Sequence, residues 1–462
     1  MLKIFNTITR SKEKFISIKK NIVNMYVCGV TVYNFCHIGH GRTFVTFDIV
    51  YRYFRHIGYK TMYIRNITDI DDKIINLAIK NNESISVFTN RMIKNMHRDF
   101  SSLNILSPDE EPKVTENIDA IIKIIKKLLK NNYAYIQNNG DVIFSVDSDI
   151  HYGKLSNQFL KNLQLGKRIK IDKNKKNPLD FVLWKKVSSS EKYYWNSPWG
   201  KGRPGWHIEC TAISSLKLGN LLDIHGGGID LLFPHHENER AQFSCFKKKH
   251  KINYWMHSGM VILNNKKMSK SLDNFILLKD LLSKYDGESI RYFLISTHYR
   301  KPLNYSEENI KKSSISLRRL YFSLKNTTIN KNFCSFPNKY QISFEEAMQD
   351  DFNTPKALLI LHSLSKKINI FKNENKLEKV EKFSNLLRNL GKVLGILYSV
   401  PEEFLQRNIK IKEEKEINSL IKKRNIARKL KNWPVSDKIR KKLFKLGIIL
   451  EDNKLSTTWR KK

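Results

Sequence analysis

His37-Ile38-Gly39-His40 is the stretch on which the fold prediction depends, together with the residues on either side of it. An apolar, strand-like run at Ile22–Val27 precedes it, and a helix-like run that ends near Tyr59 follows it. A second string, Lys267-Met268-Ser269-Lys270-Ser271, lies far downstream. Either string alone could be chance in a lysine-rich chain. Together and in this order they indicate a strand–helix unit that binds a nucleotide, with lysines supplied by a later loop.

The residue types in the two strings suit ATP. A helix N-terminus attracts phosphate through its free N–H groups and its dipole. Gly39 leaves room for a flat base to approach the backbone. Imidazoles and ammonium groups stabilise charge on the reacting phosphorus and on departing pyrophosphate. We therefore predict His37, His40, Lys267 and Lys270 as catalytic, and Gly39, His40 and Lys270 as ATP contacts.

The two strings resemble the HIGH and KMSKS signatures of the class I aminoacyl-tRNA synthetases. Longer segments are similar to the cysteinyl-tRNA synthetases within that class, over nearly the whole chain. Those segments are Tyr26–Tyr33, Asn66–Lys73, Gly205–Cys210, Asp223–Gly228, Phe233–Glu239 and Asp350–Pro355. The chain departs from the expected pattern at Cys36, Gly41, Asp273 and Gln349, but none of these changes removes a group with an obvious chemical role.

Composition favours a folded protein with a polyanionic partner. A chain of 462 residues is too long for one core and should divide into two to four domains, and its hydrophobic content of 41% is ample for folded domains. The 83 Lys and Arg against 44 Asp and Glu leave a formal charge of +39, which fits RNA or DNA as a partner. The lysines are spread along the chain, so a compositional bias explains part of this excess equally well.

The cysteines and the N-terminal sequence indicate in which cellular compartment the protein is expected. The five cysteines are odd in number and widely spaced, which is poor material for a disulfide framework and fits a reducing environment. The N-terminus has no apolar core of signal-peptide length. No apolar run approaches the roughly 18 residues of a membrane span. We expect a cytoplasmic protein with no membrane association.

The pattern along the chain predicts an α/β protein in several parts. Alternating strands and helices indicate a parallel sheet with ligand groups at the carboxyl ends of its strands. The resemblance names this a Rossmann-type catalytic domain, expected at residues 1–115 and 195–250 with a connective insertion at 116–194. A KMSKS-bearing stem-contact region (251–315), an α-helical bundle (316–401) and a small, very basic RNA-binding tail (402–462) are expected to follow. Gly287–Tyr292 should open an amphipathic helix.

Four dispersed residues could meet at one metal ion. His235 and Glu239 share a helical face if a helix covers them, and Cys28 ends a strand. Thiolate, imidazole and carboxylate all bind zinc, but no CxxC pair marks the site, so spacing alone is weak. Cys36, His236 and Cys245 compete for the same roles. The family pattern selects Cys28, Cys210, His235 and Glu239, which implies one Zn²⁺ per chain.

Other site residues are implied by the resemblance. These are Gly29, Thr31, Thr68, Trp206 and His225 for the amino acid, and Arg428, Trp433, Asp437 and Asp452 for tRNA. Some of them have a plainer alternative: Trp206 could be ordinary core, Thr68 a helix cap, and the tail a solvated basic face around one core tryptophan. Base stacking on Trp433 is the functional alternative for the tail.

The resemblance implies ATP-dependent ligation of L-cysteine to its tRNA through cysteinyl-adenylate, with Mg²⁺ accompanying the ATP and a monomeric enzyme. Two alternatives stay open. A relative could use the same adenylate to attach cysteine to a small amine, although the length and the basic tail argue against it. An RNA-binding paralogue would have a degenerate site, whereas both signatures and all four metal ligands are intact here.

Overall fold

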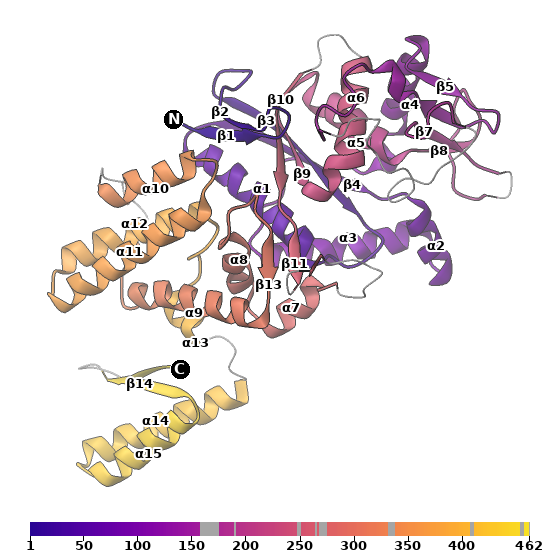
Figure 1. The fold of residues 1–462 in the computed structure, drawn as a ribbon. Coiled ribbons are helices and arrows are strands. Elements are labelled where there is room, and N and C mark those ends of the chain that lie inside the picture. The colour runs from indigo at the N-terminus through magenta and orange to yellow at the C-terminus, as the bar shows by residue number, and fades with distance from the viewer. Residues whose placement is uncertain are drawn as a thin grey trace.

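The computed structural model describes residues 1–157, 175–188, 191–246, 251–263, 266–267, 275–330, 338–406, 411–452 and 457–461. Its central element is a parallel sheet with the strand order β10-β9-β3-β4 (Figure 1). The strands are β3 (Ile22–Thr31), β4 (Lys60–Thr68), β9 (Leu221–Gly228) and β10 (Lys251–Ser258). The chain adds β4 on one side of β3 and the later strands on the other. Ligands bind at the carboxyl ends of strands where the order reverses in this way.

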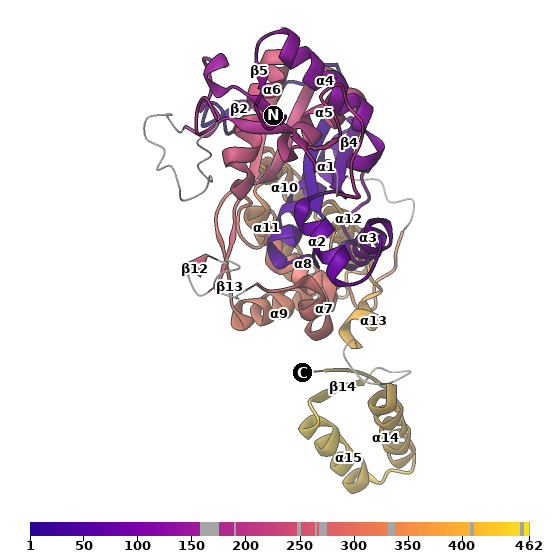
Figure 2. The same cartoon turned by 90° about the vertical axis from the view of Figure 1, so that its right-hand side faces the viewer.

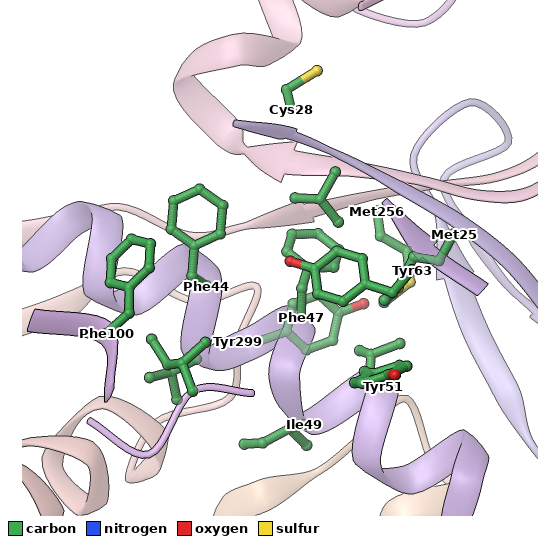
Figure 3. Close-up of a cluster of buried hydrophobic side chains, with 14 of the residues drawn as sticks. Met25, Cys28, Phe44, Phe47, Ile49, Tyr51, Tyr63, Phe100, Met256 and Tyr299 are labelled. Atoms are coloured by element: carbon green, nitrogen blue, oxygen red, sulfur yellow. The ribbon is translucent and has the colours of Figure 1, made fainter. Parts of the chain in front are cut away.

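Helices cover this sheet and connect its strands. They are α1 (Ile38–His56), α2 (Asp72–Lys80), α3 (Ile85–Ser102), α5 (Trp206–Leu218) and α6 (Glu237–Phe246). Phe44 and Phe47 of α1 are buried with Met25 of β3 and Met256 of β10, as Figure 3 shows. Burying each such side chain contributes roughly 1.5–3 kcal/mol. The predicted strand–helix alternation is confirmed, and β3 continues past the predicted end at Val27 to Thr31.

The insertion between α3 and α5 has its own small antiparallel sheet, in the order β5-β6-β7-β8. Its elements are α4 (Ile118–Lys130), β5 (Ala134–Ile136), β6 (Val142–Phe144), β7 (Phe181–Lys186) and β8 (Gly202–Pro204). The insertion's sheet also includes β8, beyond the predicted boundary at residue 194, because residues 202–204 pair with β7.

The N-terminal hairpin and the segment after β10 complete the region around the sheet. The hairpin is β1 (Lys3–Asn6) and β2 (Ser11–Lys14); the later elements are β11 (Val261–Leu263), β12 (Lys266–Lys267), α7 (Leu278–Lys284), α8 (Gly287–Ile295) and β13 (Leu303–Tyr305). Helix α8 is present as predicted, but the prediction that it is amphipathic is wrong. Glu288 and Arg291 are fully buried, because Tyr321 donates to Glu288 and Arg291 pairs with Asp48 of α1.

A helical bundle follows, with α9 (Glu307–Leu324), α10 (Lys339–Gln349), α11 (Thr354–Asn373), α12 (Leu377–Val393) and α13 (Pro401–Gln406). Two predicted boundaries cut through helices. Residue 315 lies inside α9. Residue 402 lies inside α13, which belongs with the bundle because Phe404 stacks on Tyr321 with ring centroids 3.9 Å apart.

The tail forms a small unit below α13 in Figures 1 and 2. It contains α14 (Ile411–Lys429), α15 (Trp433–Lys445) and the antiparallel pair β14 (Ile448–Asp452) and β15 (Thr457–Lys461). Ile417, Ile421, Leu443, Ile448 and Leu450 form its core, which is separate from the core of the rest of the described chain. The tail therefore has the means to fold by itself.

Candidate active site and metal centre

The end of β3 is irregular where the site begins. The register with β4 slips so that Cys28 and Gly29 together face the single residue Asn66. The Asn66 Oδ1 atom accepts from the Gly29 N–H at 2.8 Å and from the Tyr26 hydroxyl at 3.0 Å. A bulge of this kind redirects a side chain. In Figure 3 the Cys28 sulfur accordingly points away from the buried cluster that contains Phe44.

Three further side chains meet Cys28 from other elements. Cys210 lies on α5, His235 in the turn that leads into α6, and Glu239 in the first turn of α6. The Cys28 thiol is 3.1 Å from Glu239 Oε1, which is 2.9 Å from His235 Nε2, and the Cys210 sulfur is 3.6 Å from the same Nε2. All four are buried, and their donor atoms lie within 4.8 Å of one another. The fold thus brings together the whole set predicted from the resemblance.

The chemistry of this cluster fits a divalent cation. Two thiols and a carboxylate are buried side by side, which is costly for the ionised groups unless a positive charge compensates them. The Glu239 Oε2 atom receives no hydrogen bond, although His225 Nε2 lies 3.1 Å away. Sulfur, nitrogen and oxygen donors in this combination suit zinc.

A second set of donors shares part of the cluster. Cys28, His225, His236 and Glu239 also bring their ligand atoms within 4.8 Å. The two sets of donors differ in whether their residues line a cavity. Cys28, Cys210 and His235 line the large cavity described below, whereas His225 and His236 do not. The first set is therefore the one that a small substrate can reach.

Charge within the cluster is unevenly shared. Burial raises the pKa of the Cys210 thiol, but hydrogen bonds with Cys28 and His235 outweigh it and lower the pKa to about 6. Burial raises the pKa of Glu239, but the neighbouring His225 and His235 hold it well below its usual value. Burial and the neighbouring Cys210 raise the pKa of Cys28 well above its usual value. The carboxylate and one thiolate are thus the charges most readily available to a cation.

The HIGH residues build the N-terminus of α1. The His37 Nδ1 atom accepts from the N–H groups of Gly39 at 3.1 Å and of His40 at 3.4 Å, while His40 Nδ1 accepts from the His37 N–H at 3.2 Å. The two rings stack with centroids 3.8 Å apart. Burial and the neighbouring His37 hold the pKa of His40 well below its usual value. His40 is therefore neutral at pH 7.

The segment after KMSKS is attached to the same helix end. The Ile38 N–H donates to the Ile276 carbonyl at 2.9 Å, and the Phe275 ring lies 5.1 Å from the His37 ring. Lys267 belongs to β12, which pairs with β11. Lys270 lies outside the described residues. Of the motif itself the structure describes only Lys267, and the chain after the motif returns to the start of α1 at residues 275–277.

A cavity of about 450 Å³ joins the two ends of the site. Its lining includes three of the four cluster residues, His37, Gly39 and His40, and four of the predicted amino-acid contacts: Gly29, Thr31, Thr68 and Trp206. Trp206 is 43% exposed and lies 4.3 Å from the His235 ring, so it is a rim residue and not core. His225 lies behind Cys28, 3.5 Å from its sulfur, and does not line the cavity.

Sequence reasoning missed residues that support the site. Besides Asn66 and Tyr26, buried Glu209 accepts from the Thr68 hydroxyl at 2.9 Å and so joins α5 to β4. Burial and the neighbouring Cys210 raise the pKa of Glu209 well above its usual value. Asn66 and Thr68 are buried polar residues at the end of β4, and polar residues at the end of a predicted strand were the available signal.

The predicted tRNA contacts lie in the tail. Trp433 and Asp437 are exposed on α15, with Trp433 at 55%. Asp452 instead holds two cations, since Arg424 donates to it at 2.7 and 2.8 Å and Arg428 lies 2.9 Å away. Trp433 and Asp437 therefore share a surface, while Asp452 has structural partners of its own.

The parallel sheet, its insertion and the HIGH residues at the start of α1 define a class I aminoacyl-tRNA synthetase. The family model for the "tRNA synthetases class I (C) catalytic domain" matches residues 14–315. Among solved structures, Mycobacterium tuberculosis methionyl-tRNA synthetase bound by methionyl-adenylate is similar with a TM-score of 0.57, at 14% identity over 83% of this chain and 91% of that one. An Agrobacterium radiobacter LeuRS–tRNA–LeuAMS complex gives 0.58, at 11% identity over 85% and 86%.

Relatives of higher sequence identity show which family within this class the chain belongs to. A DALR domain model matches residues 343–398, and a model of the cysteinyl-tRNA ligase anticodon-binding domain matches 413–460. The cysteine–tRNA ligase of Buchnera aphidicola is 56% identical over 100% of this chain and 99% of its own length. That of Haemophilus influenzae is 52% identical over 100% of both. The chain belongs to the cysteine–tRNA ligase family and is an enzyme of tRNA aminoacylation. Within the described residues, no helix is long and apolar enough to cross a membrane.

Proposed function

We propose that the enzyme recognises L-cysteine through its sulfur at a zinc ion held by Cys28, Cys210, His235 and Glu239. The observation that carries this proposal is the convergence of these four buried donors beside a cavity that continues to the HIGH residues. When bound, Zn²⁺ would stabilise the substrate sulfur as a thiolate. The metal donors that would select the amino acid and the HIGH residues beside which it would react thus lie along one cavity.

The protein's own residues then position the first reaction. His37 and His40 meet the phosphates of ATP at the start of α1, where Gly39 leaves room for the adenine base, and Lys270 of the KMSKS motif would also meet the phosphates. A carboxylate oxygen of cysteine attacks the α-phosphorus. The bond from that phosphorus to the bridging oxygen breaks, and pyrophosphate leaves with the electron pair, accompanied by Mg²⁺. No protein nucleophile or base is required, so catalysis is positioning and electrostatic stabilisation.

Discrimination against serine follows from the donor set. A hydrophobic pocket separates near-isosteres by only roughly 10–200-fold. A hydroxyl is a much poorer zinc ligand than a thiolate, so binding through sulfur gives stronger selection without an editing site. Thr31 and Trp206, which line the same cavity, would contact the rest of the amino acid.

The zinc proposal is tested by Cys210→Ser, with Cys245→Ser as the matched control. Both cysteines are buried, but Cys245 is not part of either donor set. We expect wild type and Cys245→Ser to contain one zinc per chain. Cys210→Ser should contain less zinc, bind cysteine more weakly and discriminate less against serine. Wild-type protein free of zinc, or Cys210→Ser with normal zinc content and cysteine affinity, would contradict the proposal.

We also propose that the tail reads the anticodon loop through the exposed surface of Trp433 and Asp437. The match of residues 413–460 to an anticodon-binding domain model supports this role. An exposed indole offers a stacking surface for an unpaired base. Arg428, which forms an ion pair with Asp452, would contact phosphate. Asp452 then acts by holding Arg424 and Arg428 in place.

A further inference from the structure

A separate cavity lies where the C-terminal end of α1 meets the helical bundle (Figure 1). Its volume is about 450 Å³, and its walls come from the last two turns of α1, from Leu106, from α10 and from the second half of α12. We call it the α1–α12 cavity. None of its lining residues lines the main cavity, which contains the metal donors and the HIGH residues. Because α1 has 19 residues at about 1.5 Å each, the two cavities are roughly 20 Å apart along the helix.

The charged side chains in this lining are all basic. Arg52, Arg55 and His56 come from α1, and Lys392 comes from α12. Glu345 of α10 does not line the cavity, and it already pairs with His56 at 2.7 Å. Within the part of the chain that the structure describes, neither Arg55 nor Lys392 has a carboxylate partner. The cavity therefore carries positive charge that no carboxylate in its lining neutralises.

Arg52 is held firmly at the wall of the cavity. Its side chain is 14% exposed, and its Nε and Nη2 atoms donate to Asp48 Oδ2 at 2.7 Å and to the Asn104 carbonyl at 2.6 Å. The same Asp48 carboxylate also accepts from the buried Arg291. One carboxylate thus serves two guanidinium groups, which leaves excess positive charge beside the cavity. A buried charge without a partner is costly, so binding of an anion in the cavity is favoured.

The rest of the lining is apolar or carries an amide. Leu390 and Val393 of α12 are buried, and the neighbouring Asn389 can both donate and accept. Small-molecule sites have this form, an apolar cavity of about 300–1,000 Å³ with a few polar groups that converge. An inorganic anion would leave most of this volume and its apolar wall unused. Among the described lining residues the His56 imidazole is the one aromatic ring, whereas sites for RNA strands stack successive bases on several rings.

We propose that the α1–α12 cavity binds a phosphate monoester carried on an apolar body of nucleoside size. Such a group has a charge of about −1.5 to −2 at pH 7, which suits Arg55 and Lys392 together with the excess charge at Arg52. Arginine binds phosphate through two parallel N–H donors. Leu390 and Val393 receive the apolar body. Since α1 belongs to the catalytic domain and α12 to the bundle, the bound ligand joins the two.

Cations in the last turn of a helix also have a simpler role, because they stabilise the negative end of the helix dipole. Arg55 and Lys392 both occupy such positions, whereas Arg52 lies one turn earlier. A role toward the dipole changes the stability of the protein but gives no affinity for a ligand. Measurements of binding and of thermal unfolding on the same variants therefore separate the two roles.

AMP is the probe, titrated calorimetrically into the full-length enzyme. A non-hydrolysable cysteinyl-adenylate analogue first saturates the main cavity, so that AMP cannot bind there. We expect one AMP per chain under these conditions. Adenosine and inorganic phosphate should each bind at least about tenfold more weakly, because each lacks one half of the interaction. AMP that fails to bind, AMP that binds only when the analogue is omitted, or inorganic phosphate that binds as tightly as AMP would each overturn the proposal.

The double variant Arg55→Ala, Lys392→Ala tests the cations, and the double variant Lys123→Ala, Lys126→Ala is its matched control. The two control lysines are exposed on α4 and line neither cavity. The cavity variant should bind AMP at least about tenfold more weakly, the scale for lost hydrogen bonds to a charged group. Its cysteine-dependent ATP–pyrophosphate exchange should stay within about twofold of wild type, and the control should match wild type in both measurements.

Asn389→Asp tests the cavity without truncating a side chain, because it adds a carboxylate at nearly constant volume. It should weaken the binding of AMP, which is anionic, and leave the binding of adenosine unchanged. This second variant keeps the test valid if the double variant unfolds at a lower temperature. Unchanged affinity for AMP in both cavity variants would overturn the proposal, and a lowered unfolding temperature with unchanged affinity would assign the cations to the helix ends.

Discussion

Gly29→Ala should disable the site although the substitution adds one methyl group. Gly29 lies in the bulge of β3, directly opposite Asn66 of β4. A Cβ atom built there would be 1.6 Å from the Asn66 carbonyl oxygen and 3.3 Å from its Oδ1 atom. The obstacle is backbone, so no side-chain rotation relieves it. The two strands must separate where β3 presents Cys28.

The size of the effect follows from that distance. Cβ contacts under 3.0 Å are essentially absent from real structures, so the separation must grow by about 1.4 Å, from 1.6 to 3.0 Å. A displacement of about 1 Å in a reacting group can cost 10²-fold in rate. Crowding of this kind also destabilises by about 1–3 kcal/mol. We therefore expect cysteine-dependent exchange to fall at least about 10²-fold in kcat/KM, with a rise in KM for cysteine and a loss of bound zinc.

Gly287→Ala is the matched control. A Cβ atom at Gly287 would be 1.8 Å from the Ser102 carbonyl oxygen, which is a comparable backbone clash at the start of α8, and Gly287 does not line the main cavity. Both variants should lose similar stability in thermal unfolding, but only Gly29→Ala should lose most of its exchange activity at a temperature where both are folded. Near-normal exchange by Gly29→Ala, or an equal loss in both variants, would refute the reasoning.

Three further predictions concern the phosphates and the tail. Lys270→Ala should slow adenylate formation roughly 10²–10³-fold with little change in cysteine affinity, the scale for one preorganised charge; an unchanged exchange rate would assign this lysine to the surface. Trp433→Ala should weaken tRNA binding by about 1–3 kcal/mol while exchange persists, and equal charging of a tRNA with an altered anticodon would make Trp433 merely structural. Asp452→Asn should loosen the tail by about 0.5–1 kcal/mol, measured by hydrogen exchange in α14. The hydrogen bond from Arg424 lowers the pKa of Asp452 in the folded protein. The stability that this carboxylate contributes to the tail is therefore present above about pH 4 and is lost as the pH falls through the folded-state pKa. Equal protection of the α14 amides from hydrogen exchange in wild type and Asp452→Asn would contradict this prediction.

Local sequence patterns were sufficient to predict much of the secondary structure around the site. Strand and helix periodicity around residues 22–64 depends on neighbours along the chain, and β3, α1 and β4 follow it closely. The HIGH residues also carry their own local geometry, since His37 and His40 cap α1 with hydrogen bonds that span only three residues. The four metal donors were selected by resemblance and not by spacing, because no short repeat links Cys28 to Glu239.

The remaining features depend on packing between residues that are far apart in the sequence. Whether Glu288 and Arg291 face water depends on partners at Tyr321 and Asp48, far away in sequence, so an amphipathic pattern misread α8. The slip in register at Cys28 and Gly29 arises only when β3 pairs with β4. The cavity lined by His37, His40 and Phe275 forms because residues 275–277 return to the start of α1. Periodicity reports which side of an element is apolar, whereas these features depend on which elements meet, and that is a property of the folded chain.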